Sequence, residues 1–205
     1  MGALLDEVTV FTAAAGWAAH QVDALPEAAW DGPGLGDWDM RALVGHTGRS
    51  LLTVEQYLTA PADSEDVTSA EGYYEAAARL TGADPAAVLQ RGVDAGAALG
   101  SDPKASFRAI AERVPALLAG EHDRVVTTIV GGIRLSNYLP TRTFELVVHG
   151  LDITTAAGLP SSPPDAALRR CVDLAASLAI CTGRGPTLLL AMTGRAQLPG
   201  DLWAL

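Results

Sequence analysis

The chain has 205 residues, a length that fits one good-sized domain or a domain with a small appendage. Its formal net charge is −10, and Lys104 is its one lysine, which argues against a nucleic-acid groove and a polybasic membrane surface. Apolar residues make up 49% of the chain and aromatic residues only 5%, a composition typical of a helical protein. No apolar run approaches the roughly 20 residues that a membrane span needs.

The chain carries no sign of export. Its first eight residues lack the positive region of a secretory signal and become acidic at Asp6, so we expect a cytoplasmic protein. Cys171 and Cys181 lie in one predicted helix, about 15 Å apart by helical rise, which is too far for a disulfide. We expect both to be small buried residues in a reducing compartment.

The N-terminal third of the chain predicts three helices. Apolar residues recur at helical spacing over 4–24, and a loop rich in glycine and proline follows. Asp37 or Asp39 then caps a second helix that runs to about Leu58. A third helical region covers about 69–81.

The middle of the chain predicts two more helices and an extended segment. Asp84 and Pro85 supply a cap and a first-position proline for a helix that runs to Leu99. The next helix contains Pro115, which predicts a kink or a break. The β-branched residues 125–130 are either a lone extended segment or one arm of a hairpin.

The last third predicts one long helix and two shorter ones. The long helix begins at Leu135 or Pro140 and runs to Ala157, where a Gly-Leu-Pro sequence ends it. Residues 165–180 and 186–193 predict the shorter helices. The chain is therefore expected to be mainly α, with a helical bundle and a small C-terminal attachment.

One motif in the long helix contains side chains that could bind a metal. Glu145 and His149 stand four residues apart, so on a helix they project from one face. Their neighbours are apolar nearly all round, which predicts that the pair is buried and needs a partner. A carboxylate and an imidazole at this spacing can hold a divalent metal if a third ligand is added. His46, which lies in another amphipathic run, is the best candidate.

Each of these residues also has a plainer interpretation. The Glu145–His149 pair is often a surface ion pair, and a single histidine is more often a satisfied core or boundary residue than a ligand. Arg142 and Asp152 lie three residues outside the pair on the same face, where they either orient the ligands or form a salt-bridge network. Arg49 lies on the face of His46 and either lines a pocket or meets solvent.

Two segments together resemble a known family. Trp30 followed by the run from Pro33 to His46, and then the run from Thr141 to Asp152, resemble the mycothiol-dependent maleylpyruvate isomerase family of actinobacteria. This family belongs to a larger DinB/YfiT-like group of metal-binding proteins. The tail from residue 191 to 199 is also similar to that of many members, and the resemblance covers most of the chain.

The resemblance implies a fold and a ligand set. The fold is a DinB/YfiT-like four-helix bundle over residues 1–158, with a small helical or α+β extension over 159–205 that packs on the bundle. His46, Glu145 and His149 would bind a divalent metal, with zinc the first choice and nickel or iron the alternatives.

The resemblance also implies a thiol cosubstrate, mycothiol, whose sulfur takes the open coordination position. Arg195 in the tail, and Arg49, are the candidates for binding this cofactor. After His149 the chain has 56 residues, fewer than a full C-terminal α+β domain of the isomerase is expected to have. The identity of the substrate is therefore not carried over.

The leading hypothesis is an isomerase or S-transferase that acts on a small electrophilic substrate. A metal-bound thiolate, rather than a protein side chain, would be the nucleophile. One alternative is a hydrolase that uses metal-activated water, with Asp152 as the nearest candidate base. Another is a non-catalytic, metal-binding stress-response bundle. The expected partners are a small-molecule thiol and the electrophile, without nucleic acid or membrane, and the chain is expected to be a monomer or a homodimer.

Overall fold

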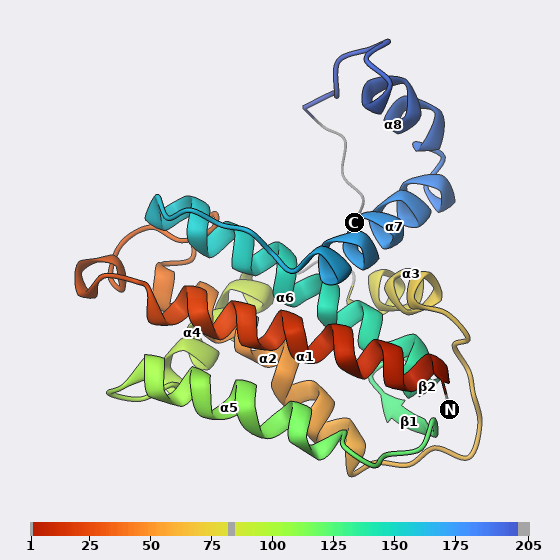
Figure 1. Ribbon diagram of the computed structural model, residues 1–205, viewed down its shortest axis with the longest axis horizontal. Coiled ribbons are helices and arrows are strands. Elements are labelled where there is room, and N and C mark those ends of the chain that lie inside the picture. Colours follow the sequence, from red (N-terminus) through yellow and green to blue (C-terminus); the bar gives the residue numbers. More distant parts are fainter. Residues whose placement is uncertain (1, 82–84, 201–205) are drawn as a thin grey trace.

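The computed structural model describes residues 2–81 and 85–200, and these form a mainly helical protein with one small hairpin (Figure 1). The elements in chain order are α1 (Gly2–Asp23), the short 3₁₀ helix η1 (Glu27–Ala29), α2 (Met40–Leu58), α3 (Ala70–Thr81), α4 (Pro85–Ala98), α5 (Pro103–Leu117), β1 (Val125–Thr128), β2 (Gly131–Arg134), α6 (Leu135–Ala157), α7 (Asp165–Cys181) and α8 (Gly185–Met192). None of the described helices is both long enough and apolar enough to span a membrane.

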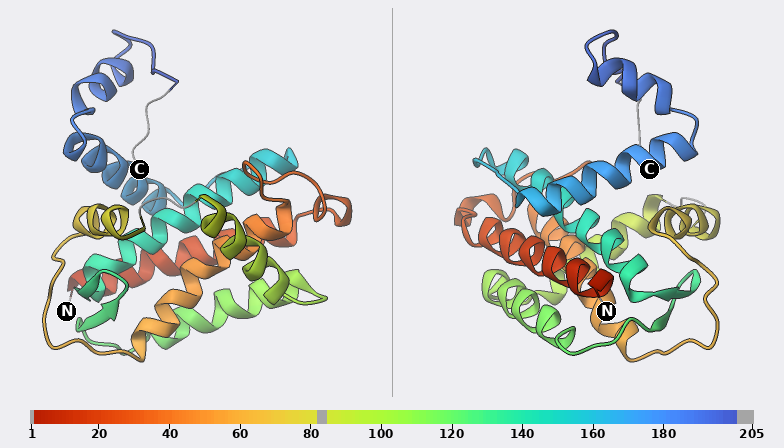
Figure 2. Two further views of the ribbon diagram at one scale, coloured as in Figure 1. Left: turned by 180° about the vertical axis from the view of Figure 1, so that it is seen from behind. Right: turned by 45° about the vertical axis from the view of Figure 1, so that its right-hand side comes forward.

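Four of these helices enclose the core. Helix α6 packs against α1 and α2, and α5 packs against the same two helices from the other side, so the four form a closed ring of neighbours (Figures 1 and 2). Fully buried side chains that fill the space between them include Phe11, Leu43, Leu51, Phe107, Val114, Leu139 and Leu146. The predicted helical bundle is confirmed.

Helix α4 packs on the outer face of α2 at very short range. A Cβ atom built on Gly45 would lie 2.2 Å from the backbone nitrogen of Gly96, so only glycine allows the two helices to approach this closely. The indole nitrogen of Trp38 donates to the carbonyl oxygen of Leu89 at 3.0 Å, which ties the loop before α2 to α4. Trp38 therefore anchors this loop to the helices.

The extended segment forms a hairpin. Strands β1 and β2 pair antiparallel, from Val125 opposite Arg134 to Thr128 opposite Gly131. Gly131 has a φ of 103°, a value that favours glycine and allows the tight turn. Because β2 runs directly into α6, the long helix begins at Leu135 rather than at Pro140, which lies inside it.

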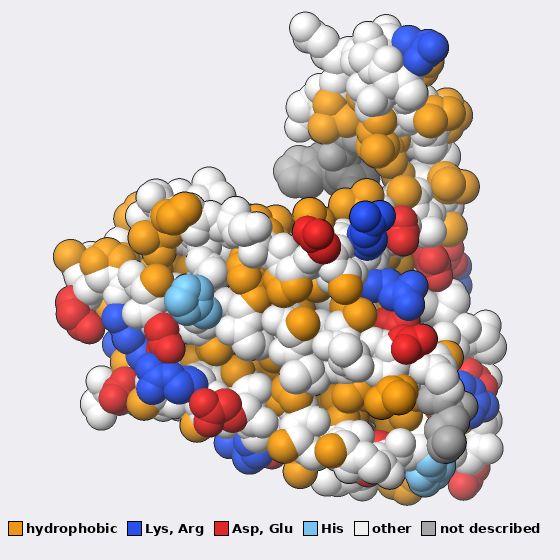
Figure 3. All heavy atoms as spheres, in the orientation of Figure 1, with side chains coloured by type: hydrophobic (Ala, Val, Ile, Leu, Met, Phe, Trp, Pro, Cys, Tyr) orange, Lys and Arg blue, Asp and Glu red, His pale blue; other side chains and the backbone are white. Residues whose placement is uncertain are grey.

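The C-terminal part is helical and has two unlike sections. Helix α7 packs on α6, α1 and α3, and its buried residues are Ala167, Cys171, Leu174, Leu178 and Ala179. Helix α8 has no buried residue and stands away from the bundle in every view (Figures 1 and 2). Residues 182–200, which include α8, form a projecting arm, and apolar side chains cover much of it (Figure 3). The exposed apolar residues of α8 include Leu189, Leu190 and Met192.

Several local predictions can be compared with the structure. Asp39 caps α2, since its carboxylate accepts a hydrogen bond from the backbone nitrogen of Ala42 at 2.7 Å. Helix α5 continues through Pro115 and ends at Leu117, so the expected break falls two residues later; this close to the end of a helix, few turns remain to be disrupted. The predicted cap Asp84 lies outside the described residues.

The prediction for the cysteines is half right. Both are free, and Cys171 is buried, but Cys181 is exposed. The expectation that Cys181 is buried is therefore wrong. Its position is the last residue of α7, where the helix leaves the bundle, and apolar spacing within a helix cannot show where its packing partner stops.

Candidate metal centre

Helix α2 presents His46 toward α6. The Asp39 cap fixes the start of α2, and Gly45 holds it close to α4, so the stretch of helix that leads to His46 is anchored at both ends. The imidazole is half-buried and packs against the indole of Trp38, with ring centroids 4.5 Å apart. Trp38 therefore supports the histidine as well as the loop, a role that the sequence pattern did not reveal.

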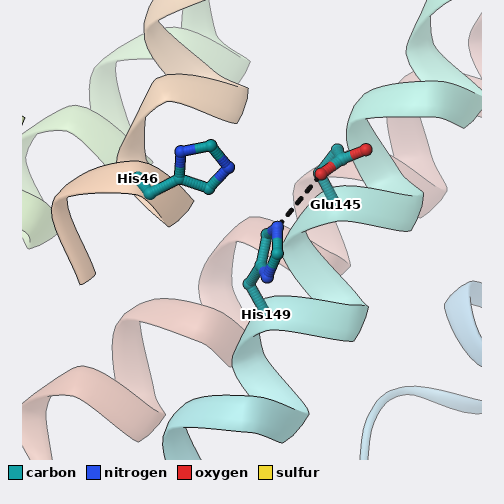
Figure 4. A group of neighbouring side chains, drawn as sticks. All are labelled: His46, Glu145 and His149. Carbon is teal, nitrogen blue, oxygen red and sulfur yellow. Dashed lines mark hydrogen bonds and ion pairs between the residues drawn. The ribbon is translucent and has the colours of Figure 1, made fainter. Parts of the chain in front are cut away.

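Helix α6 presents Glu145 and His149, one turn apart, on the face that is turned toward His46 (Figure 4). The Nε2 atom of His149 lies 3.1 Å from Oε2 of Glu145, and its Nδ1 atom lies 3.0 Å from Oδ2 of Asp152. The imidazole of His149 is thus held at both nitrogens. Asp152 is thus placed to orient the His149 ring, and the same contact also fits the alternative of a salt-bridge network.

The three predicted ligands converge. Potential ligand atoms of His46, Glu145 and His149 all lie within 4.8 Å of one another. The two imidazoles face each other nearly at right angles, with centroids 5.0 Å apart and an interplanar angle of 80°. Figure 4 shows the His46 ring directed from α2 into the space beside Glu145 and His149.

The charges of the three groups follow from their surroundings. Burial lowers the pKa of His46 to about 4, and the positive charge of His149 acts in the same direction. Burial alone would raise the pKa of Glu145, but the hydrogen bond from His149 and the charge of Arg142 outweigh it and lower the pKa to about 2. Burial likewise opposes protonation of His149, yet its hydrogen bonds to Asp152 and Glu145 raise the pKa to about 9. At neutral pH and without a metal, His46 is neutral, Glu145 is ionised and His149 carries a proton.

Tyr74 is a member of the site that sequence reasoning missed. Its hydroxyl group donates to Oε1 of Glu145 at 2.7 Å and lies 3.2 Å from the carbonyl oxygen of Thr141. Burial and the nearby charge of Glu145 raise the pKa of Tyr74 well above its usual value, so the phenol stays a donor. Tyr74 comes from α3, 71 residues before Glu145, and no spacing in the sequence connects them.

The predicted arginines are not all brought to the centre. Arg142 lies on α6 beside Glu145, and Arg49 lines a cavity of about 320 Å³ between α2, α4 and α5. The charge of Arg49 reaches His46 and contributes to its lowered pKa, after the larger effects of burial and of His149. Arg195 is exposed just after α8, on the projecting arm, where its Nη1 atom donates to the carbonyl oxygen of Thr193 at 3.3 Å. The structure does not bring Arg195 to the three ligands.

The donor set fits a divalent cation. Two imidazoles and one carboxylate are the three protein ligands of many zinc sites that keep a position open. The hydrogen bond from Nδ1 of His149 to Asp152 is the support that metal-bound histidines commonly receive. The His46 ring makes no hydrogen bond with any described residue, and its Nδ1 atom is buried without a partner, so this imidazole is not committed to another group.

The fold and the site together define a class: a helical bundle with a His/Glu/His cluster drawn from two of its helices. The family model described as mycothiol maleylpyruvate isomerase N-terminal domain matches residues 11–154, well over half of the chain. The chain therefore belongs to this family, and the predicted resemblance is confirmed. Searches of curated proteins and of solved structures gave no match.

Proposed function

We propose that this protein is a metal-dependent enzyme that uses a small thiol, mycothiol, to isomerise or S-conjugate a small electrophile. The observation that carries the proposal is the convergence of His46, Glu145 and His149 within 4.8 Å, in a member of the mycothiol maleylpyruvate isomerase family. Zinc is the cation that best suits this donor set, with nickel and iron as alternatives.

The protein's own groups prepare the site. Asp152 accepts a hydrogen bond from Nδ1 of His149, which leaves Nε2 facing Glu145, where a cation would replace the proton. Tyr74 occupies Oε1 of Glu145 and leaves Oε2 on the side of His149. When bound, the cation would supply the positive charge that lowers the pKa of an incoming thiol and makes it a nucleophile near neutral pH.

No protein thiol is a good candidate for the nucleophile. Burial raises the pKa of Cys171 to about 12, so this side chain stays protonated. Cys181 lies at the far end of α7, where the arm leaves the bundle. These positions support a model in which the reacting sulfur belongs to a cosubstrate.

The geometry favours the thiol hypothesis over hydrolysis. A hydrolase needs a general base beside the bound water, and Asp152 was the candidate. Its carboxylate instead bonds Nδ1 of His149, whereas the ligand cluster lies on the Nε2 side of that ring. Asp152 is therefore engaged on the wrong side of His149 to activate a water there.

The first test is the metal content of the purified protein. We expect the wild type to retain about one equivalent of zinc and a His46→Ala variant to lose it, both measured by elemental analysis. His122→Ala is the matched control, because His122 is exposed and should leave the zinc content unchanged. Equal zinc in the wild type and the His46→Ala variant would contradict the proposed site.

Two further measurements separate the rival functions. Since the core is apolar and packs without the cluster, removal of zinc by a chelator should leave helical circular dichroism intact; unfolding would favour a structural metal. Turnover of maleylpyruvate, and then of a panel of small electrophiles, should require mycothiol. Zinc-dependent turnover without any thiol would favour the hydrolase, and no turnover with either would favour the non-catalytic bundle.

A further inference from the structure

Arg142 is a positive charge held in place beside the metal centre. It lies on α6 one turn before Glu145 and is half-buried. Its guanidinium carbon lies 5.2 Å from the ring centroid of Tyr73 and 5.1 Å from that of Tyr138. Contacts of this kind with two aromatic rings stabilise a cation and fix the plane of the guanidinium.

The two tyrosines are themselves well anchored. Tyr138 is fully buried, and its hydroxyl group lies 3.0 Å from Oγ1 of Thr53 on α2. Tyr73, from α3, is also buried and packs against Tyr138 with ring centroids 5.5 Å apart. Because three different helices hold this platform, Arg142 has little freedom to turn elsewhere. A group that binds Arg142 would therefore cost little side-chain entropy.

The terminal nitrogens of Arg142 have no partner among the described residues. Its Nε atom donates to Oγ1 of Thr141 at 3.0 Å, but neither Nη atom makes a hydrogen bond, and no described carboxylate oxygen lies within 4.0 Å of the group. Six other arginines each pair with a carboxylate: Arg79, Arg108, Arg113, Arg124, Arg134 and Arg170. Unlike these six, Arg142 is a positioned guanidinium that keeps its fork of donors unused.

Glu145 does not pair with the Nη atoms of Arg142, although it is the nearest acidic residue along the same face of α6. Both of its carboxylate oxygens are already engaged, Oε1 by Tyr74 and Oε2 by His149. A cation bound by Glu145 would draw its negative charge further away from Arg142. The loaded site would then leave the positive charge of Arg142 without a close counterion, which is unfavourable for a desolvated group.

We propose that Arg142 binds a carboxylate group of a small ligand that reaches the metal centre. A carboxylate matches the planar fork of the two free Nη atoms and would accept two parallel hydrogen bonds. The role of this ligand as substrate rests on the proposed function, but the binding itself does not. In this assignment Arg142 selects carboxylate-bearing electrophiles over neutral ones.

The test compares maleate with its uncharged analogue dimethyl maleate. Dissociation constants would be measured by calorimetry for the zinc-loaded and the metal-free protein, without any thiol. We expect the wild type to bind maleate at least about 10-fold more tightly than the diester, and Arg142→Gln to remove most of this preference. Arg79→Gln is the matched control, because Arg79 is an exposed arginine on α3 that pairs with Glu75.

The zinc content of each sample distinguishes the possible roles of Arg142. The inference requires that Arg142→Gln keeps its zinc; loss of zinc would show that Arg142 serves Glu145 instead and would overturn it. If Arg142→Gln does not fold, Arg142→Lys replaces it, since lysine keeps the charge but not the fork, and unchanged maleate affinity there would also overturn the inference. The inference would also be overturned if the wild-type protein bound maleate neither with zinc nor without it. Maleate binding through Arg142 without any thiol-dependent turnover would leave this inference standing and count against the proposed function alone.

Discussion

At the scale of single residues, we expect the support of His149 by Asp152 to decide how well the proposed centre holds a metal. The hydrogen bond between Nδ1 and Oδ2, 3.0 Å long, fixes the orientation of the ring and would keep a proton on Nδ1 when a cation takes Nε2. Without it, the imidazole can turn about its side-chain bonds, and its Nε2 atom is no longer held toward Glu145. Metal affinity should therefore depend on a residue that is not itself a ligand.

We expect Asp152→Ala to weaken zinc binding by about 10- to 100-fold, because removal of such a partner commonly has an effect of this size. Asp152→Asn should have a smaller effect, since its amide oxygen can still accept the hydrogen bond. Competition with a chelating indicator measures both. Asp31→Ala is the control, since Asp31 is exposed in the loop before α2; equal affinities in all four proteins would mean that Asp152 plays no part in the centre.

At the scale of elements, the contact between α2 and α4 sets the position of His46. The backbones of the two helices touch at Gly45 and Gly96, where an added Cβ would lie 2.2 Å from a backbone nitrogen. A backbone atom cannot move aside as a flexible side chain can, so any side chain at residue 45 must push the helices apart. His46 is the next residue and would move with α2.

We expect Gly45→Ala to destabilise the protein by about 1–3 kcal/mol or more through overpacking, and to reduce zinc binding as well. Gly16→Ala is the matched control, because Gly16 is a solvent-exposed residue in the middle of α1, with no atom within 4 Å of an added Cβ. This control should gain about 1 kcal/mol from helix propensity. Urea unfolding measures both changes, and a Gly45→Ala variant as stable as the wild type would show that α2 and α4 can separate without cost.

At the scale of the whole molecule, the two sections of the C-terminal part differ in how they join the bundle. Helix α7 buries Ala167, Leu174 and Leu178 against it, whereas α8 buries nothing. We propose that residues 1–158 form the bundle that carries the site and that 159–205 form an extension that packs on it through α7. Within this extension, only α7 should contribute to the stability of the bundle.

Two truncations test this division. A chain that ends at residue 182 should unfold at nearly the same urea concentration as the full chain and keep its zinc. A chain that ends at residue 158 should lose several kcal/mol, because a fully buried apolar side chain contributes about 1.5–3 kcal/mol. Loss of zinc or of stability in the chain that ends at residue 182 would place the arm in the functional unit instead.

Much of the secondary structure was predictable because its signals are local. The cap at Asp39, the stop at Gly158 with its φ of 65°, and the apolar spacing within each helix act over a few residues of chain. The same is true of the spacing that puts Glu145 and His149 on one face of α6. The sequence by itself therefore determined the helices, the pair of candidate ligands and, through resemblance, the family.

Only the tertiary structure decided which distant residues meet. Tyr74 bonds Glu145, Tyr73 packs on Arg142 and His46 faces His149, each across helices that lie far apart in the sequence. The exposure of Cys181 and the distance of α8 from the bundle are likewise set by where packing partners end. Such contacts depend on how helices of similar apolar pattern pair in space, and one sequence carries no local signal for that choice.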